Sequence, residues 1–356
     1  MLSKRFGRMA AGSVAGAMLM AAAACGGGGG GTGGDATSSA AASSEAPKSG
    51  ALKVGLAFDV GGRGDKSFND AAYAGLEKAK TELSADIKEL SPAADGSNRG
   101  ELLRQLADAG YNPIIGVGFA YGDDIKKTAE EYPEIQFAVV DSASNAANVT
   151  GLLFAEEQGS YLAGVAAALK AKSGHVGFVG GVENDLIKKF QAGFEAGVKS
   201  VKKDAKIDVK YLTPDGDFSG FKAPDKGKVA AEKMYQDGAE IVYHAAGDSG
   251  LGVFQAAAAA KKKAIGVDSD QRQTVKETDL QSVIMTSMLK RVDVGVFEFI
   301  KAFQGGAKGG SNTIYDLKVD GVGLATTGGE IDDIKDKLDA AKQDIIDGKI
   351  TVPSKP

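Results

Sequence analysis

The amino-acid sequence predicts an α/β protein with two doubly wound parallel-sheet domains joined by a hinge. From residue 51 onward, short apolar runs alternate with helical patterns. The apolar runs are nearly continuous, which is typical of strands that are buried on both faces. The chain has 356 residues, and the roughly 306 that follow residue 50 exceed what a single hydrophobic core usually holds. These observations favour two open sheets, each covered by helices on both faces.

The first expected domain opens with an apolar run and continues in strict alternation. Ser67 or Asn69 could cap its first helix, in which Ala72, Leu76 and Ala79 are spaced for one face. The pattern predicts strands at 51–58, 86–90, 113–118 and 136–140, and helices at 67–83, 100–109 and 122–131.

The same alternation begins again in the second half of the chain. It predicts helices at 157–171, 185–199, 226–237 and 250–262, and strands at 175–179, 208–212, 241–244 and 264–267. A weak internal duplication supports two similar domains, because the pattern of 54–55 and 74–77 returns at 176–177 and 192–195. We expect a first lobe from 51–150 plus 275–308, and a second lobe from 151–274 plus 309–356. The chain would then cross between them near 145–155, 270–285 and 303–315 and allow hinge closure.

The first 50 residues predict export and lipid anchoring. Residues 1–24 carry three positive charges followed by a small, apolar stretch, which is typical of a signal peptide. Its end, Ala22-Ala23-Ala24-Cys25, resembles a bacterial lipobox with Cys25 as the lipidated residue, although Ala22 stands where Leu is usual. An ordinary signal peptide with an incidental cysteine is the alternative. Residues 25–50, with their Gly, Ser and Ala, are expected to form a flexible tether on the extracytoplasmic face of a bacterial cell membrane.

Composition argues against several classes of function. The net charge of −5 disfavours nucleic acid as a partner. His175 and His244 lack the spacing of metal ligands, and the single cysteine is assigned to the lipid. No G-x-S-x-G motif follows a strand, so no activated nucleophile is evident. We therefore expect a monomeric binding protein, with no catalytic residues, metal or cofactor, that touches the membrane only through its anchor.

Candidate binding residues follow the predicted strands, where ligands bind in open α/β sheets. The Gly-rich segment 59–70 contains Phe68, which is either a hydrophobic staple for the next helix or an aromatic face for a flat ligand. Asp141 and Asp268 each come directly after an apolar strand. A carboxylate accepts two hydroxyl donors at once, so these residues are suited to gripping a sugar.

Several ordered blocks resemble one known family. They span 61–69, 116–120, 156–164, 177–181, 246–252, 266–271 and 286–291. Together they are similar to the basic membrane protein family of lipoproteins, which includes the purine nucleoside receptor of spirochaetes. The resemblance covers about residues 52–350. It implies a type I periplasmic-binding-protein fold and a role as the substrate-binding component of an ABC importer, with a permease as partner.

The resemblance also implies which residues contact a nucleoside. Phe68 is similar to the aromatic residue that stacks on the base, and Asp268 to the carboxylate that binds the ribose hydroxyls. The remaining implied contacts are Asp59 and Asn69 near the base edge, a polar contact at Asp141, the cationic Lys290, and Gly247 in the block 246–252.

The second stacking aromatic has two candidates. Phe221 lies just before 223–228, which resembles the family's D-P-x-K-G-K segment with Ala223 in place of Asp. The loop at 213–220 looks expanded, so Phe218 is the reserve. The expected ligand is a nucleoside, with a purine favoured. The alternative is another small polar ligand on the same fold, such as a pentose or a signalling molecule.

Overall fold

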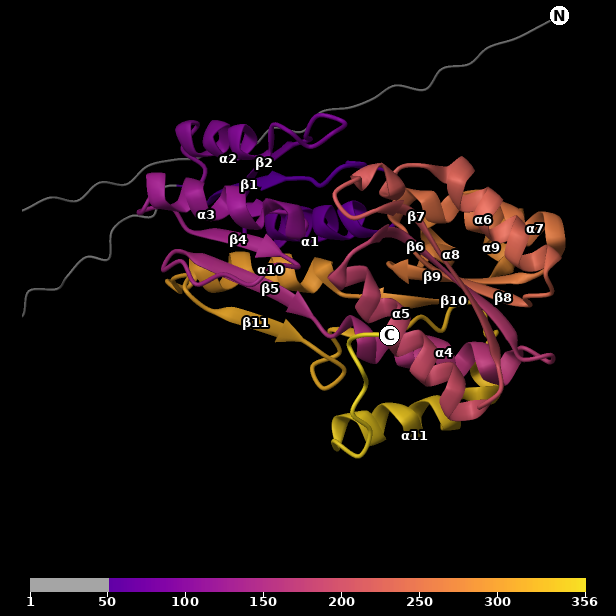
Figure 1. Ribbon diagram of the computed structural model, residues 1–356. Coiled ribbons are helices and arrows are strands. Elements are labelled where there is room, and N and C mark those ends of the chain that lie inside the picture. Colours follow the sequence, from indigo (N-terminus) through magenta and orange to yellow (C-terminus); the bar gives the residue numbers. More distant parts are fainter. Residues whose placement is uncertain (1–50) are drawn as a thin grey trace, which may run out of the picture. The chain divides into compact units, whose positions relative to one another are not determined.

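The strands form two sheets, as the alternating pattern predicted, and each sheet has six strands. The computed structural model describes residues 51–356 (Figure 1). The first sheet is entirely parallel and has the spatial order β11 (Asn312–Tyr315), β5 (Val149–Phe154), β4 (Phe137–Val140), β3 (Ile114–Gly116), β1 (Lys53–Ala57) and β2 (Asp86–Leu90). The second has the order β12 (Val322–Leu324), β10 (Ile284–Lys290), β9 (Lys263–Asp268), β8 (Ile241–Ala245), β6 (His175–Glu183) and β7 (Lys206–Pro214), with only β12 antiparallel. These sheets include β5, β10, β11 and β12, which the alternating pattern did not identify.

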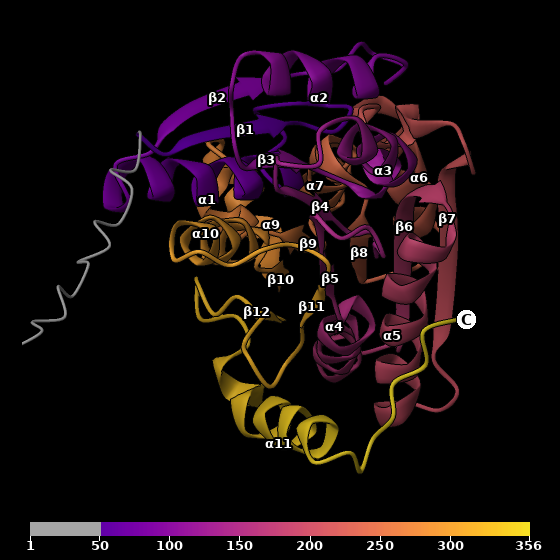
Figure 2. The same ribbon diagram turned by 90° about the vertical axis from the view of Figure 1, so that its left-hand side faces the viewer.

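Helices pack in pairs beside these sheets (Figure 2). The first lobe consists of the first sheet with α1 (Phe68–Glu82), α2 (Arg99–Asp108), α3 (Gly122–Glu131) and α10 (Val292–Gln304), and α1 packs against α10. The second lobe consists of the second sheet with α4 (Glu156–Lys170), α5 (Asp185–Val201), α6 (Pro224–Gln236), α7 (Gly250–Ala260), α8 (Gln271–Thr274), α9 (Thr278–Val283) and α11 (Lys335–Ile346). Helices α4 and α5 approach each other closely at Gly193. A Cβ at this position would lie only 2.1 Å from the Glu157 carbonyl oxygen, so only glycine fits there.

The chain passes between the lobes at positions that differ from two of those expected. It crosses after β5, after β10 at residue 291, and between β11 and β12 at 316–321. The expectation for β10 is corrected, because this strand pairs with β9 in the second sheet. The expectation for β11 is also corrected, because it pairs with β5 in the first sheet, and all of β5 belongs there too. These boundaries depend on which strands become neighbours, and an apolar run carries no local signal for its partner.

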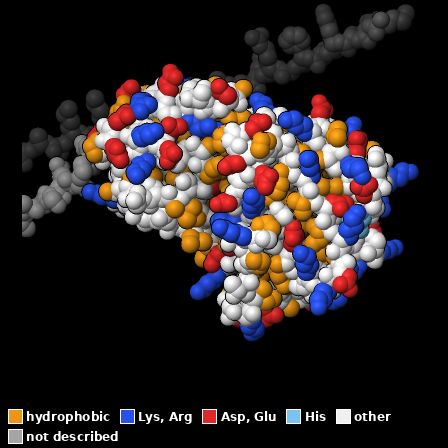
Figure 3. All heavy atoms as spheres, viewed as in Figure 1, with side chains coloured by type: hydrophobic (Ala, Val, Ile, Leu, Met, Phe, Trp, Pro, Cys, Tyr) orange, Lys and Arg blue, Asp and Glu red, His pale blue; other side chains and the backbone are white. Residues whose placement is uncertain are grey.

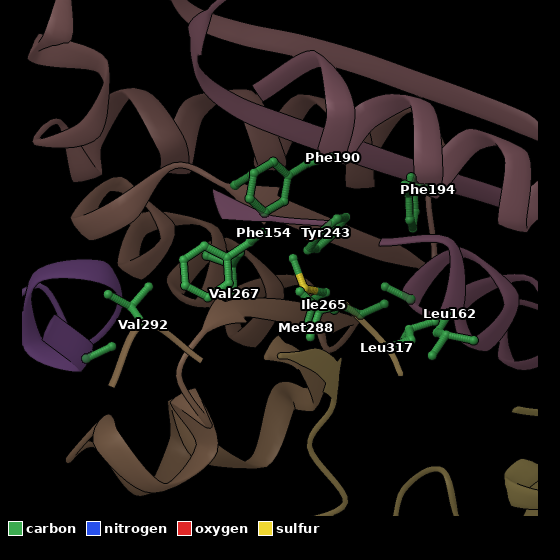
Figure 4. Close-up of a cluster of buried hydrophobic side chains, with 14 of the residues drawn as sticks. Phe154, Leu162, Phe190, Phe194, Tyr243, Ile265, Val267, Met288, Val292 and Leu317 are labelled. Atoms are coloured by element: carbon green, nitrogen blue, oxygen red, sulfur yellow. The ribbon is translucent and has the colours of Figure 1, made fainter. Parts of the chain in front are cut away.

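The largest hydrophobic cluster draws on both lobes (Figure 4). Phe154 from β5 and Val292 from α10 belong to the same cluster as Phe190 from α5 and Met288 from β10, and all four side chains are buried. The two lobes therefore share one buried apolar cluster close to the points where the chain crosses between them.

The predicted signal peptide, Cys25 and the tether lie outside the described residues. Within residues 51–356, the search for a helix long and apolar enough to span a membrane finds none. On the face seen in Figure 3, lysine and arginine side chains are intermixed with aspartate and glutamate.

Candidate functional site

A cavity that is partly open to solvent lies between the two lobes. Residues from the carboxyl ends of strands in both sheets line it, which is where open α/β sheets bind ligands. The predicted candidates that line it are Asp59, Phe68, Asn69, Asp141, Phe221, Gly247, Asp268 and Lys290. Phe218 is absent from this lining.

Two of these carboxylates share an unusual backbone conformation. Asp141 follows β4 with φ 67°, and Asp268 ends β9 with φ 63°. This left-handed region is uncommon for residues other than glycine, although aspartate tolerates it better than most. It turns the chain abruptly where the strand ends, so both side chains line the cavity instead of continuing the alternation of the sheet.

Lys290 is the electrostatic centre of the cavity. Its side chain is 2% exposed, and its Nζ atom lies 2.6 Å from Asp141 Oδ2 and 3.2 Å from Glu156 Oε1. The ammonium also lies 5.1 Å, 5.2 Å and 5.6 Å from the ring centroids of Phe68, Phe154 and Phe190. Burial alone would lower the pKa of Lys290, but Asp141, Glu156 and Asp268 together raise it above its usual value. Lys290 therefore stays charged and holds the carboxylates around it.

Asp268 contacts a residue from the opposite lobe. Its Oδ2 atom accepts a hydrogen bond from the hydroxyl of Ser67, which immediately precedes α1. Burial raises the pKa of Asp268, while Lys290 and the Ser67 hydroxyl oppose that rise. A buried carboxylate that already accepts one hydroxyl can accept others, because each of its oxygens has two lone pairs.

The opposite part of the cavity is built by the loop after β1. The backbone N–H of Asp59 donates to Asn69 Oδ1 at 2.9 Å, and Asn69 Nδ2 donates to Asp65 Oδ2 at 3.1 Å. Asp59 Oδ1 accepts from Arg99 Nη2 at 3.1 Å. Burial raises the pKa of Asp59, and the Arg99 charge opposes this rise. Asn69 therefore orders the loop that presents Asp59, in addition to lining the cavity.

Asp65, which the sequence did not identify as a site residue, organises the start of α1. Its carboxylate accepts the backbone N–H groups of Ser67, Asn69 and Asp70. Ser67 occupies the N-cap position but makes no side-chain capping bond, because its hydroxyl is donated to Asp268. The expectation that Ser67 or Asn69 caps the helix is therefore corrected. Asp65 satisfies the free N–H groups and leaves Ser67 available to the other lobe.

Four aromatic rings line the cavity. Phe68 and Phe119 come from the first lobe, and Phe190 and Phe221 from the second. Phe119 comes three residues after the end of β3, so its position after a strand was a usable signal. Phe190 lies inside α5 and had no such signal, because its periodicity is that of an ordinary buried helix face. The aliphatic Leu186 and Ile187, in the first turn of α5, complete this wall.

The two histidines lie apart from the cavity lining. His244 Nε2 is 2.9 Å from Gln271 Oε1, and burial lowers the pKa of His244 to about 4. His175 Nε2 is 2.6 Å from Asp208 Oδ2. Among residues 51–356, no group of three or more His, Cys, Asp or Glu side chains is arranged to hold a metal ion. The chemistry of the cavity is that of aromatic faces, carboxylates and one ammonium group.

Comparison with known proteins agrees with this architecture. Residues 52–355 match the family described as ABC transporter substrate-binding protein PnrA-like. The chain is similar to the ABC transporter nucleoside-binding protein BmpA of Lactococcus lactis, with 37% identity over 85% of this chain and 90% of that protein. It is also similar to basic membrane protein A of Borreliella afzelii, with 34% identity over 86% of this chain and 93% of that protein.

A solved structure supports the same assignment. An ABC transporter solute-binding protein from Aeropyrum pernix superposes with a TM-score of 0.73 and 28% identity, covering 85% of this chain and 93% of that one. The type I periplasmic-binding-protein fold is thereby confirmed. With the family match spanning almost all of the described residues, the chain belongs to the PnrA-like family of ABC transporter substrate-binding proteins.

Proposed function

We propose that this protein binds nucleosides, with purine nucleosides favoured, in the cavity between its lobes and delivers them to the permease of an ABC importer. The observation that carries the proposal is the composition of the cavity. Four phenylalanine rings share one space with two separately held sets of carboxylates. A nucleoside has a matching division, because its base is flat and its ribose carries vicinal hydroxyl groups.

The aromatic residues are suited to the base. Phe68 and Phe221 come from opposite lobes, so a base bound between them would contact both lobes at once. Stacking of a base on an aromatic side chain contributes roughly 1–3 kcal/mol. The larger surface of a purine would use this contact more fully than a pyrimidine. Asp59, held by Arg99, would accept N–H donors from the edge of the base.

The ribose is assigned to the cluster around Lys290. Asp268 would accept the vicinal hydroxyls, in the manner in which it accepts the Ser67 hydroxyl. Lys290 keeps the surrounding carboxylates compensated, which limits the cost of burying Asp268 when the lobes close. Asp141 is held by Lys290 and would act mainly by fixing that ammonium group.

Binding between two lobes provides a mechanism for transport. A ligand that contacts both lobes stabilises the closed form by the difference between its affinities for the closed and open forms. The closed form would be the one that the permease recognises. Cys25, if lipidated, would keep the protein at the extracytoplasmic membrane surface, and the two acyl chains would be enough for stable anchoring. The nucleoside-binding name of the Lactococcus lactis relative supports the ligand class.

A thermal-shift screen tests this proposal. The protein is heated with purine and pyrimidine nucleosides, free bases and pentoses, each at several concentrations. A ligand that binds the folded state raises the melting temperature by an amount that grows with its concentration relative to Kd. We expect the largest shifts for purine ribonucleosides. Larger shifts for pentoses than for any nucleoside would favour the sugar-receptor alternative and contradict the proposal.

A further inference from the structure

Phe218 contacts the opposite lobe, whereas Phe221, three residues later, lines the cavity. It begins the 3₁₀ turn η2 (Phe218–Phe221) of the second lobe. Its ring centroid lies 5.7 Å from that of Phe119 and 5.0 Å from the Arg99 guanidinium carbon, and both of these residues belong to the first lobe. The Asp217 side chain stabilises the start of this turn, because its Oδ1 atom accepts a hydrogen bond from the Ser219 N–H at 3.0 Å. The expanded loop that made Phe218 a candidate for stacking thus forms a bridge between the lobes.

Arg99 is the partner that gives this bridge a chemical role. Its side chain is 7% exposed, and it donates to Asp59 Oδ1 at 3.1 Å and to the Gly96 carbonyl at 3.2 Å. Its Nε atom is buried and finds no acceptor among the described residues. A buried guanidinium that lacks hydrogen-bond acceptors is stabilised by contact with an aromatic ring. Phe218 of the second lobe provides such a ring. Gly96 has φ 69°, and a Cβ there would lie 2.4 Å from the guanidinium carbon.

Asp59 is the carboxylate that Arg99 controls. Its Oδ1 atom is used by Arg99 and by the backbone N–H of Val60. The Arg99 charge acts on Asp59, and the Asp59 charge acts in turn on Tyr121, whose hydroxyl donates to the Phe58 carbonyl at 2.8 Å. Arg99 is therefore the one cation paired with Asp59 among the described residues. Its guanidinium carbon lies 5.7 Å from the Tyr121 ring of its own lobe and 5.0 Å from the Phe218 ring of the second lobe.

We propose that Arg99 is a positioning residue that couples closure of the lobes to the orientation and charge of Asp59, with Phe218 as the surface that holds its guanidinium in place. The part of this inference that concerns ligand binding rests on the proposed nucleoside function, whereas the part that concerns closure of the lobes does not. When the lobes separate, Phe218 leaves Arg99, and water takes its place around the guanidinium. When they close, Arg99 holds Asp59 as an oriented acceptor, so ligands that offer N–H donors at the edge of the base are selected in the closed form.

Binding of guanosine to the full chain tests the coupling, since guanine offers adjacent N–H donors to a carboxylate. Calorimetry is expected to show that Phe218→Leu and Arg99→Lys each weaken guanosine binding about 2- to 30-fold. Phe218→Tyr keeps the aromatic face and should bind like wild type. The double variant Arg99→Lys/Phe218→Leu should bind guanosine no more weakly than the single variant with the larger loss of affinity, because the two residues act through one contact. Arg104→Lys, on the same helix but in an exposed pair with Glu131, is the matched control.

A pH profile separates positioning from mere packing. Arg99→Met removes the charge that opposes the effect of burial on Asp59, so the pKa of Asp59 rises further. Guanosine binding should then be lost at a higher pH on acidification than in wild type. Arg99→Lys keeps the charge and should keep the wild-type profile. An unchanged profile for Arg99→Met would overturn the charge part of the proposal.

A distance measurement makes the test independent of the ligand. Spin labels on Lys127→Cys in the first lobe and Lys203→Cys in the second, in a Cys25→Ser background, report the separation of the lobes by pulsed electron paramagnetic resonance. Phe218→Leu and Arg99→Lys should shift the distances toward longer values, and Arg104→Lys should not. If no nucleoside binds but the distances shift, the proposed function fails and the coupling of Arg99 to closure stands. Wild-type distances for Phe218→Leu, or additive losses of guanosine binding in the double variant, would overturn it.

Discussion

The Nζ atom of Lys290 lies 2.6 Å from Oδ2 of Asp141, although the two residues are 149 positions apart and come from different sheets. The Oε1 atom of Glu156 lies 3.2 Å from the same ammonium nitrogen. A cation from the second sheet therefore compensates a carboxylate at the end of a first-sheet strand. One buried ion cluster therefore joins the two sheets at the wall of the cavity.

Replacement of Lys290 by methionine should strongly destabilise the protein. The apolar part of the side chain is retained, but Asp141 and Glu156 lose their counter-charge in a buried site. Breaking a buried ion pair by removing one partner costs about 3–5 kcal/mol. Urea denaturation should show a fall of this size in the free energy of unfolding. Lys301→Met, which removes an exposed partner of Glu298, serves as the control and should leave the free energy almost unchanged. Equal effects of the two variants would contradict the central role of Lys290.

The stability of the wild-type protein should fall between weakly acidic and weakly alkaline pH because of Asp141. Burial raises the pKa of Asp141 to about 7, although Lys290 opposes the rise. The folded state then binds more protons than the unfolded state between the unfolded and folded pKa values, so the free energy of unfolding decreases as pH rises through that window. Asp141→Asn does not titrate and should flatten this decrease. Urea titrations from about pH 5 to about pH 8 measure both slopes. A steeper decrease in the variant would exclude Asp141 as the cause.

Removal of the Phe221 ring should weaken nucleoside binding while leaving any binding of free ribose nearly unchanged. Phe221→Ala removes one stacking face of the cavity, which costs about 1–3 kcal/mol, or one to two orders of magnitude in Kd. Phe68→Ala should have an effect of similar size from the other lobe. Phe303→Ala, in α10 and outside the cavity lining, is the control. Wild-type calorimetric affinity in both cavity variants would return Phe68 to the role of a hydrophobic staple.

We expect Asp268 to recognise the ribose by accepting hydrogen bonds from its vicinal hydroxyls. Asp268→Ala removes the acceptor of the vicinal hydroxyls and should weaken ribonucleoside binding by about 2–5 kcal/mol, because buried hydroxyls are left unpaired. A 2′,3′-dideoxynucleoside should bind wild type poorly and lose far less on the substitution. Asp268→Asn is the finer probe, since it exchanges one acceptor for a donor at constant size. Asp270→Ala tests a carboxylate two residues away that lies outside the cavity lining. Equal wild-type affinity for ribonucleoside and dideoxynucleoside would show that Asp268 does not recognise the sugar.

Cys25→Ser should release the protein from the membrane fraction, or leave its signal uncleaved, without changing its ligand affinity. Serine cannot accept the thioether-linked lipid, and the cavity is built from residues 59–290. Detergent-phase partitioning and palmitate labelling measure anchoring, while calorimetry measures affinity. Ser44→Ala in the same segment is the control. Unchanged palmitate labelling of Cys25→Ser would exclude Cys25 as the lipidated residue.

Local features of the sequence predicted the strands and helices of the two alternating series, although not β5, β10, β11 or β12, and they indicated part of the candidate site. The strand at Asp86–Leu90 and the helix at Gly122–Glu131 have the predicted bounds, because apolar runs and helical spacing act over only a few residues. Asp141 and Asp268 could be placed near a site because each directly follows a buried strand, and carboxyl ends of parallel strands lie along one edge of a sheet. The resemblance to a known family favoured a ligand contact over a hydrophobic staple for Phe68, and it added Lys290, which no local pattern had indicated.

Only the tertiary structure decided which of these residues meet. β10 joined the second sheet through its pairing with β9, and that choice brought Lys290 to Asp141 and Glu156. The turn η2 directed Phe221 into the cavity and Phe218 toward Arg99, although both are phenylalanines in one four-residue segment. Phe190 reached the cavity from inside a helix. The physical reason is the same in each case: contacts between residues far apart in sequence depend on how strands are ordered and lobes packed, and neither hydrophobic period nor local propensity encodes that order.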